Sequence, residues 1–198
     1  MKLDKYFQKH IFDLWAWRTQ AFLGKEKVDR LASLYEQHPR RDLFWLTRWS
    51  KTPELKKREM LSGGGGLYRH VRLLSFLFYV VESGRTEAPE SLDEDACMMA
   101  SNHLPDNKDL TEMSQSGFSE TTYQGVGFGL GFSVILDPVK TQSLTGIGEY
   151  GWGGAASTVF WVNPKEEMVV IFLTQLLPSS TYQVRRELRP FDLFFVDA

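Results

Sequence analysis

The C-terminal half of this chain is organised around one stretch, Tyr150-Gly151-Trp152-Gly153-Gly154-Ala155-Ala156-Ser157-Thr158. Gly153 and Gly154 leave the backbone open to close approach by a ligand, and Trp152 sets a large apolar ring beside them. The β-rich run 157–162, the turn 163–167 and the apolar run 168–174 that follow predict an antiparallel hairpin. The same residues also fit a purely structural alternative, in which the glycines only form a bend before a core hairpin.

A second glycine-rich segment precedes this stretch. Gly125, Gly127, Gly129 and Gly131 alternate with apolar residues as far as Val134. A period of two predicts one strand with its glycines on one face, and a glycine face predicts close approach of another backbone or side chain. We expect a loop over 138–149.

The end of the chain, residues 179–196, has the pattern of a closing helix. Ser179, Ser180 and Thr181 are candidate N-caps. Pro190 lies inside the segment and is expected to stop or kink the helix.

The N-terminal half has mainly helical patterns. Apolar residues spaced by three and four predict helices over 2–15, 25–36, 67–83 and 92–102. Residues 39–61 are expected to be rich in loops, and residues 105–121 to form a polar surface loop. The tetraglycine at 63–66 is expected to be a flexible turn.

The composition excludes several classes of protein. The chain has 198 residues, 42% of them hydrophobic, and one cysteine, so it has neither the profile of a disordered protein nor an internal disulfide or cysteine-based zinc site. No run approaches the roughly 18 apolar residues of a membrane helix. The start has no apolar leader segment. We therefore expect a cytoplasmic protein without a membrane partner.

The charge is divided unevenly. Residues 1–72 carry 16 Lys and Arg against 8 Asp and Glu, and residues 73–198 carry 7 against 17. Such asymmetry is found in nucleic-acid-binding arms, but also in domains whose two halves complement each other. The basic part has no continuous basic run and no RNA-binding motif, which favours complementary halves.

Motifs for catalysis and cofactor binding are sparse. The four histidines stand 28, 32 and 33 residues apart, so no pair has metal-ligand spacing. No dinucleotide or phosphate-loop motif is complete, and we predict neither metal nor cofactor. A serine nucleophile needs an activating neighbour, yet the chain contains no S-x-x-K, Y-x-N, K-T-G or G-x-S-x-G motif.

The stretch over 150–180 resembles the C-terminal part of the serine β-lactamase and penicillin-binding-protein-like hydrolases, in the esterase and class C-like branch. There, W-G-G replaces K-T-G on the strand that lines the active site. Segments 61–67, 101–105 and 125–132 fit that branch in order and spacing, and residues 3–12 and 26–32 resemble its helical domain. Residues 14–19 depart from it, because the usual Leu-Gly-Met is lost.

The resemblance implies an α+β fold, a partial β-lactamase/transpeptidase-like one. We expect a single incomplete domain over 1–198, with a helical lobe over 1–121 and antiparallel strands plus a C-terminal helix over 122–198. By position, Trp152, Gly153 and Gly154 match the family triplet, and Ala155 supplies an oxyanion N–H. Tyr150 and Ser157 are supporting residues.

The resemblance also implies an ester or lactam substrate, hydrolysed through an acyl-enzyme formed on the serine of S-x-x-K. That motif lies upstream of the part matched here, so nucleophile and base are absent and we expect the chain to be inactive alone. Its expected partners are a missing N-terminal half or a second copy, because a sheet without its neighbours exposes edges. Two alternatives stay open: a degenerate paralogue that only binds a ligand or partner, and an RNA-binding protein that uses the basic half, although the resemblance argues against nucleic acid.

Overall fold

The computed structural model describes residues 1–13, 21–22, 32–38, 41–45, 67–68, 97–113 and 123–192. The chain divides into two compact units, residues 1–73 and 74–198. The predicted organisation into 1–121 and 122–198 remains a prediction.

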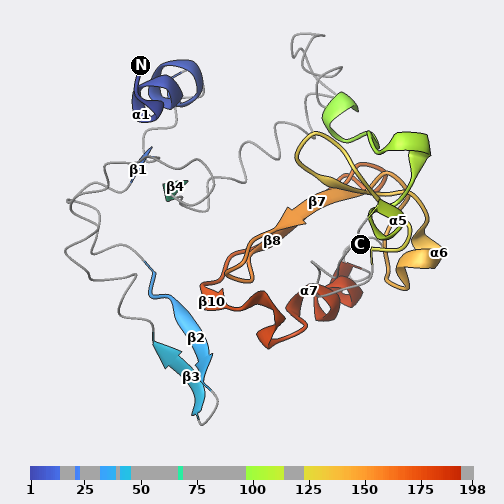
Figure 1. The fold of residues 1–198 in the computed structure, drawn as a ribbon. Helices are drawn as coiled ribbons and strands as arrows, with labels where there is room; N and C mark the ends of the chain where they lie inside the picture. The colour runs from blue at the N-terminus through green and yellow to red at the C-terminus, as the bar shows by residue number, and fades with distance from the viewer. Residues whose placement is uncertain are drawn as a thin grey trace. The chain divides into compact units, whose positions relative to one another are not determined.

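The first unit begins with a helix and contains short strand pairs (Figure 1). Helix α1 (Leu3–Phe7) continues as the π-helical turn η1 (Gln8–Phe12), which confirms the predicted helix over most of its length. Strand β1 (Ala21–Phe22) pairs antiparallel with β4 (Leu67–Tyr68), and β2 (Tyr35–His38) pairs antiparallel with β3 (Arg41–Trp45).

Three predictions for this unit are wrong where the structure describes them. Residues 35–36 are strand rather than helix, residues 41–45 are strand rather than loop, and residues 67–68 are strand rather than helix. Aromatic and apolar residues suit either element, and a strand partner within reach decides between them. The tetraglycine, residues 69–83 and most of 25–34 lie outside the described residues.

The second unit is built on a five-stranded antiparallel sheet of order β5-β6-β7-β8-β9 (Figure 1). Its strands are β5 (Val126–Phe128), β6 (Ser133–Ile135), β7 (Tyr150–Gly153), β8 (Val159–Asn163) and β9 (Met168–Phe172). The predicted hairpin is β8–β9, with the register Trp161↔Val170 at its centre. Trp161 and Val162 are almost completely buried and form the middle of the core.

The segment predicted as one strand over 125–134 is instead the tight hairpin β5–β6. Gly129 N–H donates to Phe132 O at 2.8 Å, and Gly131 takes a φ of +109°, which only glycine adopts readily. The predicted close approach is confirmed. A Cβ on Gly127 would lie 2.5 Å from the Asn102 side chain, and one on Gly129 would collide with the Met99 carbonyl.

Short helical segments surround the sheet. They are η4 (Pro105–Asn107), α5 (Leu110–Met113), α6 (Pro138–Thr141), η5 (Ser179–Thr181), α7 (Val184–Glu187) and η6 (Arg189–Asp192); a two-residue strand, β10 (Leu176–Leu177), precedes η5. Residues 97–99 are helical, as expected. The helical turns over 105–107, 110–113 and 138–141 replace parts of the predicted loops.

Asp109 explains why one of those loops is structured. Its carboxylate accepts hydrogen bonds from the Glu112 and Gly125 N–H groups, both at 2.9 Å, while Glu112 accepts from the Asp109 N–H at 3.0 Å. This reciprocal pair is a capping box at the start of α5. It also ties α5 to the first residue before β5.

The predicted closing helix is broken into η5, α7 and η6. Pro190 is the second residue of η6 and cannot continue α7, because it has no N–H to donate. The proposed N-caps are wrong: Gln183 occupies that position without a side-chain bond, and the Thr181 hydroxyl donates to Pro178 O at 2.7 Å instead. Among the described helices, none is long and apolar enough to span a bilayer.

Candidate functional site

Trp152, Gly153, Gly154 and Ala155 lie at the end of β7 and in the turn that follows it. Gly154 N–H donates to Thr158 O at 2.8 Å, and Ser157 N–H donates to Gly154 O at 3.1 Å. Together these bonds close a tight turn between β7 and β8. The four sequence-predicted positions therefore lie consecutively at the end of β7 and in this turn.

The pairing register shows which way the backbone groups of β7 point. The Gly154 N–H donates to Thr158 O, so the backbone groups of Gly154 face β8. Trp152 lies two residues earlier, opposite Phe160, so its N–H and C=O also face β8. Because these groups alternate along an antiparallel strand, those of Gly153 face the other side. There, β6 pairs with Tyr150 and Gly151 only. Within the described part of the chain, the edge of β7 is consequently open from Gly153 onward, and no hydrogen bond engages the exposed Ala155 N–H.

One face of the sheet beside this edge is aromatic. Trp152 is 40% exposed and meets Phe128 edge-on, with ring centroids 4.9 Å apart. Tyr150, on the same face, is buried against Phe132 at 5.4 Å. The open backbone edge is thus bordered by an apolar wall.

Tyr150 is a buried phenol. Burial, with the nearby Cys97 thiol as a second cause, raises the pKa of Tyr150 to about 12. A neutral phenol at this position can donate a hydrogen bond or pack, but it does not act as a phenolate base near neutral pH.

Ser157 supports the turn. Its hydroxyl donates to Leu176 O at 2.7 Å and its backbone has a φ of +65°, while the next residue, Thr158, donates to Thr174 O at 3.1 Å. Ser157 is buried and committed to a main-chain carbonyl. Its geometry is that of a structural serine rather than of an activated nucleophile.

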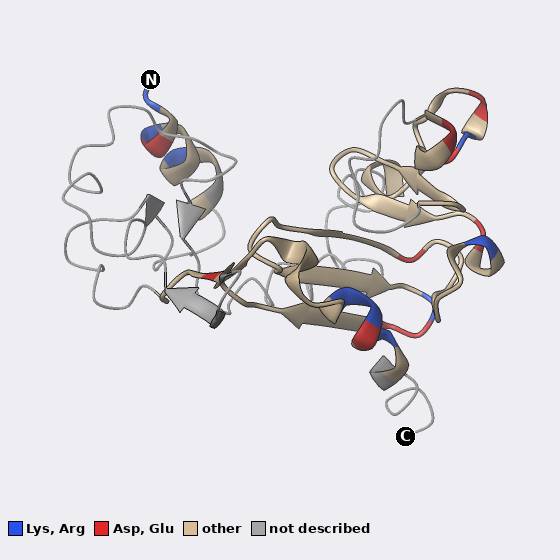
Figure 2. Ribbon diagram, turned by 60° about the horizontal axis from the view of Figure 1, so that its bottom comes forward, with Lys and Arg blue, Asp and Glu red and all other residues tan. Residues whose placement is uncertain are grey.

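The other face of the sheet is covered by the C-terminal segment, whose α7 carries basic residues (Figure 2). Arg185 donates to Gly154 O at 2.8 Å, and its guanidinium lies where a Cβ on Gly153 would be, at 2.5 Å. The two glycines consequently differ. Gly153 has no room for a side chain, whereas a Cβ on Gly154 would meet only Thr158, at 3.8 Å.

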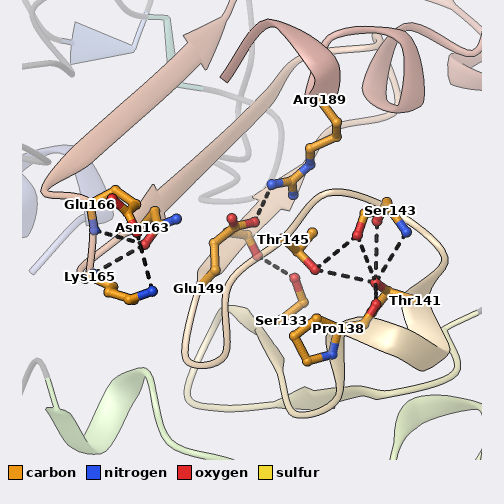
Figure 3. A network of polar contacts seen from close by, with 11 residues as sticks. Ser133, Pro138, Thr141, Ser143, Thr145, Glu149, Asn163, Lys165, Glu166 and Arg189 are labelled. Carbon is orange, nitrogen blue, oxygen red and sulfur yellow. Dashed lines mark hydrogen bonds and ion pairs between the residues drawn. The ribbon is translucent and has the colours of Figure 1, made fainter. Parts of the chain in front are cut away.

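A buried ion pair anchors the start of β7. Arg189 Nη1 donates to Glu149 Oε1, and the Arg189 guanidinium lies 4.1 Å from the centroid of the Trp161 ring. Figure 3 shows Arg189 reaching Glu149, with Ser133 and the hydroxyl cluster of Thr141, Ser143 and Thr145 close by. Arg185, Arg189 and Glu149 were not predicted from the sequence.

These residues line an open cavity of about 490 Å³ between the sheet and the C-terminal segment. Three arginines and one carboxylate line it, which leaves its wall basic. Polar hydroxyls from the 141–145 loop and from η5 face the same space. Within the described ranges, no three metal-ligating side chains come together.

Solved structures share this fold. Simvastatin synthase (LovD) from Aspergillus terreus, as the LovD6 mutant, superposes with a TM-score of 0.74 at 19% identity, over 98% of this chain and 49% of LovD. EstCE1, a hydrolase with promiscuous acyltransferase activity, superposes with a TM-score of 0.64 at 18% identity, over 96% of this chain and 50% of EstCE1. The fold is the mixed α+β architecture of the β-lactamase/transpeptidase-like serine hydrolases, as the sequence predicted.

A family model described as Beta-lactamase matches residues 1–192, and the chain belongs to that family. Protein Rv1367c of Mycobacterium tuberculosis strain H37Rv is 27% identical over 136 residues, which cover 64% of this chain and 32% of Rv1367c. The chain thus spans about a third of this curated relative and about half of the solved structures.

Proposed function

We propose that this chain contributes the substrate-binding strand of a β-lactamase-family acyl-transfer site, and that it acts only with a segment that supplies the S-x-x-K nucleophile. The observation that carries the proposal is the open edge of β7, where Gly153 turns its amide groups away from β8 and the Ala155 N–H has no partner among the described residues. The substrate class is a small ester or lactam.

Each residue has a role in this proposal. The serine oxygen attacks the substrate carbonyl as its proton passes to the lysine of S-x-x-K, and the carbonyl oxygen becomes an oxyanion to which the Ala155 N–H donates. Collapse of this intermediate breaks the ester or lactam C–O or C–N bond, and the leaving oxygen or nitrogen takes up the proton. A donor such as the Ala155 N–H stabilises charge that develops in the transition state. The Gly153 edge aligns the acyl group by main-chain hydrogen bonds, and Trp152 excludes water from one side. Tyr150 and Ser157 support the strand and its turn.

The chain has no S-x-x-K motif, so the proposal predicts inactivity in isolation. We expect that the purified chain hydrolyses neither p-nitrophenyl butyrate nor a chromogenic cephalosporin, and that a fluorophosphonate probe does not label it. Stoichiometric labelling at any serine would overturn the proposal.

Complementation tests the role of the strand itself. The chain is mixed with a polypeptide comprising the half of EstCE1 that the superposition leaves uncovered, and p-nitrophenyl butyrate hydrolysis is measured. We expect activity in the mixture only. Gly154→Val adds a branched side chain next to the Ala155 N–H, which should keep the oxyanion from reaching that donor and lower kcat roughly 10²–10³-fold, the range for loss of one oxyanion donor.

Gly154 is the informative position because it has room for a Cβ, whereas a substitution at Gly153 displaces Arg185 and disturbs the fold as well. Val139→Ala, at an exposed residue of α6, is the matched control and should leave kcat unchanged. Full activity of Gly154→Val in the mixture would reject the site. Binding of an ester without hydrolysis in any mixture would favour the ligand-binding alternative.

A further inference from the structure

The Gly154 carbonyl and the Ala155 N–H belong to one peptide group. Among the described residues the only cis bond is Leu177-Pro178, so this group is trans, and a planar trans peptide points its N–H away from its C=O. The contacts of the Gly154 carbonyl therefore set the direction of the Ala155 N–H. Because the carbonyl is bonded within the turn toward β8, the N–H points out of the open edge of β7.

Two donors hold that carbonyl. The Ser157 N–H donates to Gly154 O at 3.1 Å, and Arg185 Nη2 donates to it at 2.8 Å, with a longer contact to Thr158 O at 3.5 Å. A carbonyl oxygen has two lone pairs, so both can be engaged here. The bond from Arg185 carries a formal charge, and charge-assisted hydrogen bonds are roughly twice as strong as neutral ones. Arg185 is therefore the stronger of the two anchors.

Gly153 makes the contact with Arg185 possible. A Cβ at this position would lie 2.5 Å from the Cζ and Nη2 atoms of Arg185, so any other residue would push the guanidinium away. The contact joins residues 31 positions apart, and it requires the C-terminal segment to pack on this face of the sheet. The missing side chain of Gly153 thus admits the arginine that holds the following peptide group.

We infer that Arg185 is a positioning residue for the proposed oxyanion donor, an inference that rests on the proposed function. It fixes the Gly154–Ala155 peptide, so that the Ala155 N–H is aimed before the substrate arrives. It also polarises this peptide, because successive hydrogen bonds strengthen one another. Its cation lies within roughly 8 Å of an oxyanion bound at the Ala155 N–H. Arg185 acts through the peptide group rather than on the substrate.

Nuclear magnetic resonance of the ¹⁵N-labelled chain tests the contact without any substrate. A donor at a carbonyl draws electron density from the nitrogen of the same peptide group, so Arg185→Ala should move the Ala155 ¹⁵N resonance to lower frequency. Arg186→Ala, at the exposed neighbour on α7, is the matched control and should leave this resonance in place. An Ala155 resonance that does not move in a folded Arg185→Ala chain would overturn the inference.

Kinetics in the mixture with the uncovered half of EstCE1 test the catalytic consequence. Arg185→Ala should lower kcat for p-nitrophenyl butyrate about tenfold, less than the roughly 10²–10³-fold cost of losing the donor itself. The KM should hardly change, because the ester is neutral in the ground state and negative charge develops only in the transition state. An unchanged kcat would reject the inference and leave the proposed function intact.

Added guanidinium distinguishes positioning from a structural tie. Arg185→Ala leaves a space beside Gly153 in which a free guanidinium ion can donate to Gly154 O, but a free ion cannot join α7 to the sheet. Millimolar guanidinium chloride, well below denaturing concentrations, should restore kcat and the Ala155 resonance, whereas the same concentration of sodium chloride should restore neither. A loss of kcat that guanidinium does not restore, with unchanged circular dichroism, would assign Arg185 a structural role and overturn the inference.

Gly153→Ala provides a second route should Arg185→Ala fail to fold. Its Cβ displaces the guanidinium while the arginine remains in the chain, so the Ala155 resonance should move in the same direction, and an unmoved resonance would count against the inference. The outcomes also separate the two proposals. If the unsubstituted mixture shows no hydrolysis, the proposed function fails, and the Ala155 resonance still decides whether Arg185 holds and polarises the peptide.

Discussion

The ion pair between Glu149 and Arg189 is the polar interaction whose loss should cost the second unit most. The Glu149 side chain is 2% exposed and the Arg189 side chain 18% exposed, and the guanidinium also stacks on Trp161, which is 1% exposed. Removing one partner of a buried pair costs about 3–5 kcal/mol, because the other charge is left in a poorly solvated site.

The two partners should not be equivalent. Arg189→Met leaves a carboxylate that hardly reaches water and also removes the cation–π contact, worth about 0.5–2 kcal/mol. We expect this variant to lose about 4 kcal/mol of unfolding free energy. Glu149→Met leaves a cation that retains Trp161 and some solvent, so its loss should be about 2–3 kcal/mol. The double variant leaves no buried charge and should lose less than Arg189→Met alone.

The assay is urea unfolding at pH 7, followed by circular dichroism and analysed as a double-mutant cycle. Arg186→Met changes the neighbouring exposed arginine and should shift the unfolding free energy by less than about 0.5 kcal/mol. Additive losses in the cycle, or a loss below about 1 kcal/mol for Arg189→Met, would refute this account of the anchor.

Three further predictions concern other positions. Burial acts to raise the pKa of the Asp109 carboxyl, but the N–H donors of Gly125, Glu112 and Thr111, together with the nearby Lys140, lower this pKa overall. The ionised Asp109 therefore stabilises the fold at any pH above the ordinary carboxyl pKa. This stabilisation is lost as the pH falls through the lowered pKa of the folded state. Asp109→Asn should flatten the acid side of a Tm–pH profile, and an unchanged slope would contradict this. Burial raises the pKa of Tyr150 to about 12, so above pH 10 the folded state keeps the phenol proton that the unfolded state releases. The stability of the fold therefore falls as the pH rises toward 12. Tyr150→Phe has no phenol to ionise and should unfold at higher pH in an alkaline titration. Gly127→Ala collides with Asn102 and should cost about 1–3 kcal/mol, whereas Gly154→Ala should be close to neutral, and equal effects of the two would show that the sheet adjusts.

The elements that the sequence predicted correctly are those with a local signal. The β8–β9 hairpin has two apolar runs on either side of a turn, and the first helix has a regular spacing of apolar residues. The hairpin at 125–134 was missed because its glycines both continue an alternating pattern and permit a turn. Residues 67–68 pair with residues 21–22, which are far away in the sequence, and no local pattern contains such a partner. Residues 35–38 pair with the neighbouring strand 41–45, a local hairpin that was missed because the apolar spacing before it also fits a helix.

The amino-acid sequence by itself determined the family, the α+β class and the position of the candidate strand, because Trp152, Gly153, Gly154 and Ala155 are consecutive and their residue types are visible in any reading of the chain. Only the tertiary structure decided what surrounds them. Arg185 is 31 residues from Gly154, and Arg189 is 40 residues from Glu149. Contacts over such separations depend on where the broken C-terminal helices pack on the sheet. The same packing distinguishes Gly153, which has no room for a side chain, from Gly154, which does.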